Sequence, residues 1–168
     1  GIVTMGAVGP VWAGVSLPIV NAGFEDPVLA EGAWRSTVPG WTQGMYDVAA
    51  PTVWIVAFSD AGVWNPDTSG YFHGSAPEGF NMGYATTRAG YHTGLSQVLQ
   101  SCIAALQPDA TYELSAVVGN PYLYNGGATA NYRIELLAGG VLLASASGPS
   151  PPTDATWEFP RVIYNSAS

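Results

Sequence analysis

The sequence predicts an all-β protein in which two antiparallel sheets pack face to face as a jelly-roll sandwich. Short apolar or alternating runs follow one another along the 168 residues, separated by clusters of Gly, Pro, Asn and Asp, and no helical period persists. Hydrophobic residues make up 48% of the chain and charged residues 10%. A buried core is therefore available, and we assign the 21 glycines and 13 prolines to turns rather than to disorder.

The most regular strands lie in the second half of the chain. Residues 111–118 alternate, which places Tyr112, Leu114 and the apolar residues that follow on one face. Residues 131–136 alternate in the same way, and Ala138-Gly139-Gly140 turns them into a further apolar run over residues 141–145. This segment predicts a β-hairpin.

Five further strands are predicted from short apolar runs between turn residues: Leu17–Val20, Val53–Phe58, Asn81–Ala85, Leu95–Leu99 and Trp157–Tyr164. Pro160 interrupts the last of them, so that strand should lie at an edge or carry a bulge. Residues 21–52 and 59–80 are expected to be rich in loops, where binding chemistry is usually displayed. Helix should be limited to a turn near Gln100–Leu106.

A sandwich core consumes aromatic side chains, and four are predicted to lie there: Trp34, Trp54, Trp157 and Phe159. Trp41 follows Pro39-Gly40, and Trp64 precedes Asn65-Pro66. Packing beneath loops is the favoured interpretation for both tryptophans, with a role in ligand binding as the alternative.

The charge balance restricts the partners. Twelve acidic residues face four arginines, with no lysine, and the net charge is −8. Without a basic patch, binding to nucleic acid or to an anionic membrane is not expected. The single cysteine, Cys102, excludes an intrachain disulfide, and no Cys/His cluster has zinc-site spacing.

No constellation for catalysis is found. The chain lacks a Gly-x-Ser-x-Gly nucleophile elbow, and its two histidines, His73 and His92, have no histidine neighbour at metal-ligand spacing. No pair of carboxylates can be placed across a cleft from the sequence, as glycoside hydrolysis would require. The sequence therefore predicts a protein that is not an enzyme.

Binding has better support, because sugar-binding sites combine aromatic platforms with a few polar side chains. Such residues lie in or beside the predicted loops and connections. The candidate ligand-binding residues are Tyr71, His73, Arg88, Tyr91, His92, Tyr122, Tyr124 and Trp64.

Several motifs occur in an order typical of one superfamily. They include Asn-Ala-Gly-Phe-Glu-Asp-Pro at residues 21–27, Val-Pro-Gly-Trp at 38–41, Pro-Glu-Gly-Phe-Asn at 77–81 and Leu-Ser-Gln-Val-Leu at 95–99. The series resembles secreted bacterial galactose-binding-like β-sandwich domains, to which many carbohydrate-binding modules belong. It is similar above all to those in exported proteins with a Pro-Glu-Pro C-terminal sorting signal, and it extends over residues 18–164.

The resemblance implies a non-catalytic module, secreted or at the cell surface, that binds carbohydrate or another surface polymer. It also implies a structural Ca²⁺ at Glu25, which matches the glutamate of the family motif. Asn21 and Asp26 are the helpers expected nearby, since calcium takes six to eight oxygen ligands. From the sequence alone, the same acidic pair is equally consistent with a solvated turn.

Two regions are expected: an apolar N-terminal arm over residues 1–17 and a sandwich over residues 18–168. The family pattern continues into a further strand with an Asp-Asn-Val motif, which this sequence does not contain, so an apolar edge would need a cover. The arm is the candidate cover, either on its own sandwich or in a neighbouring copy. The alternative function is therefore a structural or assembly protein that forms homo-oligomers through residues 1–17 and has no small ligand.

Overall fold

The computed structural model describes residues 2–4, 17–47, 50–55, 61–66, 77–86, 91–99, 106–119, 131–149 and 157–167, of which 2–4, 45–47, 50–55 and 91–92 are described as backbone only. Their regular structure consists of β-strands, all paired antiparallel, and these residues contain no helix. The prediction of an all-β protein is confirmed. Within this part of the chain there is correspondingly no helix that is apolar and long enough to cross a membrane.

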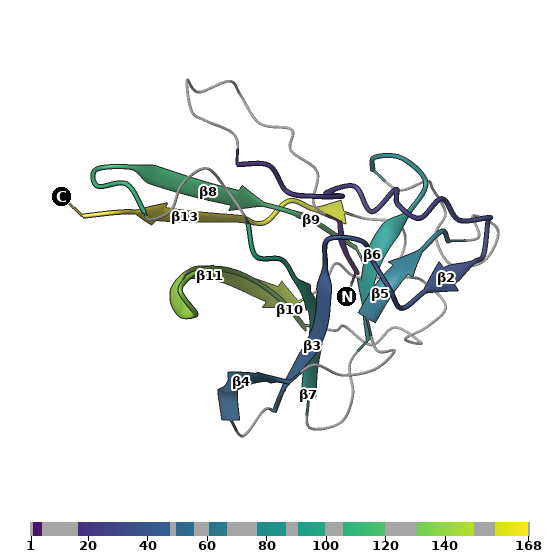
Figure 1. The fold of residues 1–168 in the computed structure, drawn as a ribbon, viewed down its shortest axis with the longest axis horizontal. Coiled ribbons are helices and arrows are strands. Elements are labelled where there is room, and N and C mark those ends of the chain that lie inside the picture. Colours follow the sequence, from purple (N-terminus) through teal and green to yellow (C-terminus); the bar gives the residue numbers. More distant parts are fainter. Residues whose placement is uncertain are drawn as a thin grey trace.

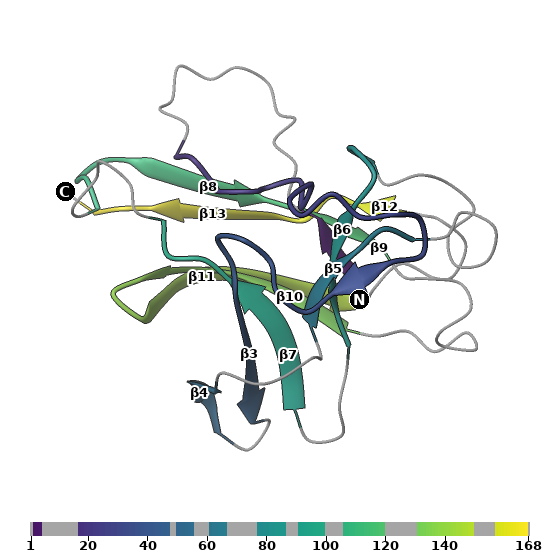
Figure 2. The same cartoon turned by 45° about the vertical axis from the view of Figure 1, so that its right-hand side comes forward.

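Two layers face each other at one end of the molecule (Figures 1 and 2). One layer pairs β8 (Thr111–Ser115) with β13 (Arg161–Asn165), and the other is the hairpin of β10 (Asn131–Ala138) and β11 (Val141–Pro149). The buried side chains between the layers are Ala116, Ile134 and Val162, with Leu114, Leu136, Ala144 and Ala146 packed around them. Facing layers with a shared apolar interior are what the alternating runs predicted.

The hairpin itself is confirmed. Its turn residues Gly139 and Gly140 have φ values of 56° and 81°, a left-handed conformation that glycine adopts without steric cost. The two strands pair from Asn131 opposite Pro149 to Ala138 opposite Val141, with a bulge at Leu136/Leu137.

The strand predicted over residues 111–118 is divided at Ala116. β8 pairs with β13. β9 (Val117–Gly119) pairs instead with β1 (Ile2–Thr4) on one side and β12 (Trp157–Glu158) on the other. Pro160 separates β12 from β13, as predicted, and its carbonyl accepts the N–H of Ala116 at 3.1 Å. The described part of the arm, β1, therefore lies on its own chain.

Two further sheets lie partly in the stretches, residues 21–52 and 59–80, that were expected to be rich in loops. One sheet orders β2 (Trp34–Arg35), β5 (Ala61–Trp64) and β6 (Met82–Ala85) side by side. Most of these strands are too short to show an alternating pattern in the sequence, and each of the longer two contains a glycine. Loops were the wrong prediction for β2 and β5, whereas β6 matches the predicted strand at Asn81–Ala85.

The other sheet places β3 (Thr42–Asp47) between β4 (Ala50–Ile55) and β7 (Tyr91–Ser96). It lies on the opposite side of the molecule from β8 and β13 in both ribbon views (Figures 1 and 2). β3 was not predicted, and β4 and β7 begin earlier in the chain than the strands predicted at Val53 and Leu95. Residues 17–19 are irregular and Val20 opens a turn, so the strand predicted at Leu17–Val20 is also wrong.

The core differs from the predicted one. Trp34 is 54% exposed and Phe159 is 68% exposed, because β2 is a short edge strand and Phe159 lies in the break at Pro160, while Trp157 is half-buried against Met82. Smaller apolar side chains fill the interior near the N-terminal segment: Phe24, Leu29, Val38 and Val63. The side chain of Trp54 and residues 100–105 of the predicted helical turn lie outside what the structure describes.

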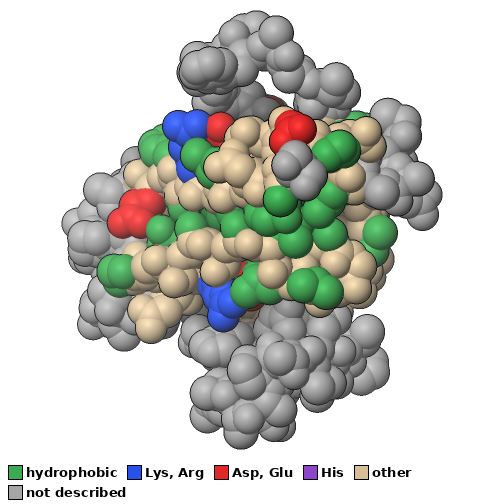
Figure 3. Space-filling model, turned by 90° about the vertical axis from the view of Figure 1, so that its left-hand side faces the viewer, with side chains coloured by type: hydrophobic (Ala, Val, Ile, Leu, Met, Phe, Trp, Pro, Cys, Tyr) green, Lys and Arg blue, Asp and Glu red, His purple; other side chains and the backbone are tan. Residues whose placement is uncertain are grey.

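Apolar side chains also reach the surface at the end of the molecule where the hairpin turns. Figure 3 shows a band of hydrophobic side chains crossing the middle of this face. Leu137, Val141 and Leu142 near the hairpin turn are 44%, 65% and 44% exposed, and Ile163 on β13 is also exposed. No other described strand covers these side chains at this end.

The two-layer core makes a prediction about two isoleucines. Ile134 is 4% exposed between the layers, and Ile163 is 53% exposed on β13. Ile134→Ala should lower the free energy of unfolding by about 2–5 kcal/mol through the cavity it leaves. The matched control Ile163→Ala should cost less than about 1 kcal/mol. Urea denaturation measures both, and equal losses would contradict the assignment of Ile134 to a shared interior.

Candidate functional site

An N-terminal turn, residues 20–27, is built by side chains that bond to its own backbone. Asn21 and Phe24 have positive φ values of 52° and 61°, so the chain bends sharply here. The Asn21 amide donates to the carbonyl of Asp26 at 2.6 Å, and its Oδ1 accepts the N–H of Asp26 at 3.0 Å. Asn21 therefore closes the turn, which agrees with the preference of asparagine for this backbone conformation.

Glu25 joins the N-terminal turn to a segment more than fifty residues away. Its Oε1 accepts the backbone N–H groups of Phe80 at 2.9 Å and Asn81 at 2.8 Å. Gly79 precedes them with φ of 67°, and a Cβ at this position would overlap the Glu25 carboxylate. The Pro-Glu-Gly-Phe-Asn motif thus supplies a glycine that lets the chain approach the carboxylate.

Asn81 completes this connection from inside the protein. It is 1% exposed, and its amide nitrogen donates to the carbonyls of Phe24 at 3.0 Å and Pro27 at 2.9 Å. Its Oδ1 is buried and has no hydrogen-bond partner in the described part of the chain. A buried acceptor without a donor is uncommon and calls for a bound ion, water or donor group.

The oxygens at the N-terminal turn suit a hard cation only in part. Asn21 Oδ1 and Glu25 Oε1 already accept N–H groups, whereas Glu25 Oε2 has no protein partner among the described residues. Asn81 Oδ1 was not among the predicted ligands and adds a second available oxygen. The described residues contain no group of three or more His, Cys, Asp or Glu placed to hold a metal.

The sheet of β4, β3 and β7 brings aromatic and ionisable residues into register. Tyr46 lies between Trp54 on β4 and His92 on β7, and Asp47 lies opposite Tyr91. Two of the predicted ligand-binding residues, Tyr91 and His92, are therefore on this sheet. The sequence did not indicate Tyr46 or Asp47, because β3 carries no regular alternation.

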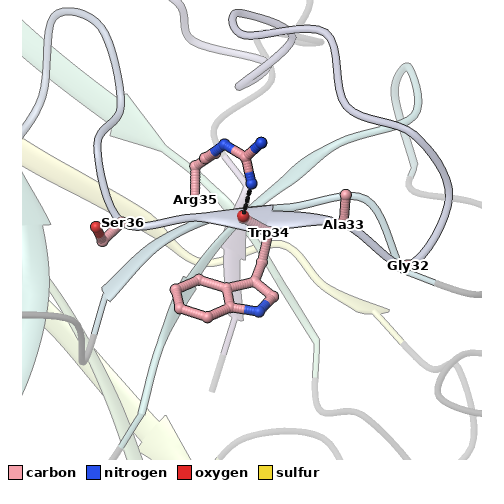
Figure 4. Close-up of a pocket in the computed structure, with 5 residues that line it drawn as sticks. All are labelled: Gly32, Ala33, Trp34, Arg35 and Ser36. Carbon is pink, nitrogen blue, oxygen red and sulfur yellow. Dashed lines mark hydrogen bonds between the residues drawn. The ribbon is translucent and has the colours of Figure 1, made fainter.

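A shallow hollow of about 500 Å³ lies at the edge strand β2, lined by residues 32–36 (Figure 4). The Arg35 guanidinium donates to the carbonyl of Trp34 at 2.9 Å. Figure 4 shows the Trp34 indole and the Arg35 guanidinium on opposite sides of the strand. These two side chains cannot both face one small ligand, so the hollow is a weaker candidate than the three-stranded sheet.

Trp64 is the only predicted ligand-binding residue whose side chain the structure describes. It is half-buried on β5 and packs against Met82, in agreement with the packing role that the sequence favoured over ligand binding. Five of the others lie outside the described residues: Tyr71, His73, Arg88, Tyr122 and Tyr124.

One further polar pair, Tyr132 and Glu158, ties β10 to β12. The Tyr132 hydroxyl donates to Glu158 Oε2 at 3.2 Å. Burial, followed by the hydrogen bond to this carboxylate and its charge, raises the pKa of Tyr132 above 10.0. The phenol therefore remains a protonated donor at neutral pH, and its contribution is to hold the two strands together.

The strands and their partners define an all-β protein of facing antiparallel sheets. A sequence model of the HpiC1-like family, described as HpiC1 cyclase, matches residues 15–168. The chain therefore belongs to the HpiC1 cyclase family. No curated protein matches it.

Solved structures of cyclases are similar to the chain. The Stig cyclase Fisc from Fischerella sp. TAU, in complex with (3Z)-3-(1-methyl-2-pyrrolidinylidene)-3H-indole, is 29% identical with a TM-score of 0.70, covering 91% of this chain and 80% of that one. An apo cyclase from Fischerella sp. is 30% identical with a TM-score of 0.68, and the match covers 91% of this chain and 79% of that one. A cyclase from Fischerella sp. TAU in complex with 4-(1H-indol-3-yl)butan-2-one is 29% identical with a TM-score of 0.68, covering 92% and 80%.

These comparisons correct the interpretation of the motifs. The predicted family, the galactose-binding-like carbohydrate-binding modules of exported proteins with a sorting signal, is wrong. The prediction of a protein that is not an enzyme is also wrong, because the family and its structural neighbours are cyclases. The predicted carbohydrate or surface-polymer partner and the alternative assembly function are wrong as well, since two of these neighbours hold indole ligands. The physical reason is that the motif residues Asn21, Glu25 and Gly79 build turns, so they mark a loop architecture rather than a ligand.

Asn81 provides a test of the connection to the N-terminal turn. Asn81→Ala removes the donor for the two carbonyls of Phe24 and Pro27, so the free energy of unfolding should fall by about 2–4 kcal/mol. Asn165→Ala is the matched control, since Asn165 is exposed and accepts one side-chain hydrogen bond from Thr111. It should cost less than about 1 kcal/mol. Equal losses in chemical denaturation would show that Asn81 does not support this fold from within.

Proposed function

We propose that the protein is a cyclase that closes a ring in a small molecule carrying an indole. The observation that carries the proposal is the family match over residues 15–168. Two of the similar cyclase structures hold 3-substituted indole compounds, which supports the indole as the recognised group.

The sheet of β4, β3 and β7 is the site that we assign to this ligand. Its register places Trp54, Tyr46 and His92 in one row across three strands. Aromatic residues favour an indole ring, since the two ring systems bury apolar area against each other and can stack. The assignment keeps the predicted ligand-binding residue His92 and gives it a different ligand, whereas Tyr91, the preceding residue of the strand, belongs to the opposite face of the sheet.

Ring closure joins two atoms of the same substrate, so the main task of the site is to hold a flexible molecule in the closing conformation. Holding the two reacting atoms in this orientation supplies a large part of the reduction in the activation barrier of an intramolecular reaction. A proton that leaves or enters the ring system requires an ionisable group, and the register offers His92, which shares a face of the sheet with Tyr46.

We also assign the facing layers to the jelly-roll type, because their antiparallel strands pack across a shared interior. A location outside the cytoplasm stays a prediction from the sequence.

Binding of an indole tests the proposed function directly. Titration calorimetry with 4-(1H-indol-3-yl)butan-2-one should give saturable binding, and Tyr46→Ala or His92→Ala should weaken it about tenfold through the loss of one stacking or polar contact. Tyr164→Ala on β13 is the control, because Tyr164 lies in the opposite layer against Tyr112, and it should leave the affinity unchanged. A wild-type protein that binds no indole compound would contradict the proposal.

We further propose that the N-terminal turn takes up a structural Ca²⁺. The side-chain oxygens that would hold it are Oε2 of Glu25 and the buried Oδ1 of Asn81, while Asn21 and Asp26 shape the turn. Calcium prefers such oxygens and accepts backbone carbonyls and water as further ligands. When bound, the ion would neutralise the Glu25 carboxylate and stiffen the connection between the N-terminal turn and Asn81.

Thermal unfolding tests the calcium proposal. Saturating Ca²⁺ should raise the Tm of the wild type by about 5 °C over the value in chelator, since an ion that binds only the folded state stabilises that state. Glu25→Gln keeps an oxygen for the N–H groups of Phe80 and Asn81 but removes the charge, so most of the increase should disappear. Glu113→Gln, which removes a surface carboxylate paired with Arg161, should keep the full increase. The same response in all three proteins would exclude Glu25 as a ligand.

A further inference from the structure

We infer that Gln97 is a positioning residue whose side-chain amide aligns β7 and β3, and with them the row of Tyr46 and His92. The inference rests on the proposed function, because that row is the assigned indole site. Gln97 itself lies directly after β7 and is separated from His92 by the length of the strand.

The amide of Gln97 makes three hydrogen bonds to the backbone of two other segments. Its Oε1 accepts the N–H of Val20 at 2.8 Å, and its Nε2 donates to the carbonyls of Val20 at 2.9 Å and Gly40 at 2.7 Å. An amide that engages both the N–H and the C=O of one residue reproduces the hydrogen-bond pair between strands. Gln97 therefore continues the pairing of β7 beyond its last backbone partner.

The surroundings of this amide are tightly packed. Gly40 has φ of 82°, and a Cβ there would lie 2.8 Å from Val20 Cγ1 and 3.2 Å from Gln97 Nε2. Trp41, which follows, stacks on Phe24 with ring centroids 5.1 Å apart and donates its indole N–H to the carbonyl of Asn21 at 3.2 Å. The N-terminal turn, the start of β3 and the end of β7 thus meet at Gln97.

The same two strands carry this anchor at one end and the proposed site at the other. β3 and β7 pair without interruption from Thr42 opposite Ser96 to Asp47 opposite Tyr91. Because the pair is continuous, we infer that a shift at Ser96 changes the pairing of the strands toward Tyr46 and His92. Loss of the Gln97 hydrogen bonds should therefore alter the alignment of Tyr46 with His92.

The test is Gln97→Glu, which keeps the size of the side chain but replaces the Nε2 donor by an oxygen facing two carbonyls. We expect roughly tenfold weaker binding of 4-(1H-indol-3-yl)butan-2-one, measured where the variant is fully folded, together with faster hydrogen exchange at the Val20 amide. Gln43→Glu is the matched control, since Gln43 lies on β3 and its side chain makes no hydrogen bond within the described residues. Its affinity should equal that of the wild type.

Gln97→Met, which removes the hydrogen bonds without adding a charge, replaces Gln97→Glu if the latter does not fold. Unchanged affinity alongside lost protection of Val20 would overturn the inference, because Gln97 would then be only structural. If the wild type binds no indole compound, the proposed function fails separately. In that case hydrogen exchange at the amides of Tyr46 and His92 decides: acceleration in the Gln97 variant but not in Gln43→Glu supports positioning, and no change contradicts it.

Discussion

In the irregular part of this fold, side chains supply hydrogen-bond partners to backbone groups that lie outside regular strands. Backbone N–H and C=O groups need hydrogen-bond partners, and the described residues of the N-terminal turn form no strand that could provide them. Glu25, Asn81 and Gln97 provide them instead, each by bonding to a segment more than fifty residues away. These three side chains therefore connect the N-terminal turn and its neighbours to distant strands.

This constraint explains why the motifs in the sequence are so distinct and yet gave the wrong family. Asn21 and Gly79 are required by positive φ values, and Glu25 by the N–H groups it must accept. Such requirements belong to a way of folding loops over a sandwich, and they are the same whether the molecule binds a sugar or cyclises an indole compound. Function resides in other residues placed on that frame.

The two facing layers also leave an apolar band on the surface at the hairpin end. Where the layers of β8/β13 and β10/β11 face each other, the interior is filled by small and medium side chains such as Ala116, Ile134 and Val162. At the edge the layers are not closed by another described strand, and apolar side chains remain on the surface (Figure 3). The described part of the N-terminal arm, β1, is used elsewhere, beside β9.

The sequence by itself determined the all-β class, the hairpin with its Gly139-Gly140 turn and the break at Pro160, because local alternation and backbone chemistry decide these features. The short strands β2 and β5 were decided by tertiary structure, since their few residues gain stability only from pairing with distant partners, and β3 was missed because its sequence does not alternate. The same holds for the candidate site. His92 was identifiable as a polar residue, but its place beside Tyr46 depends on the register between β3 and β7, which no local pattern encodes.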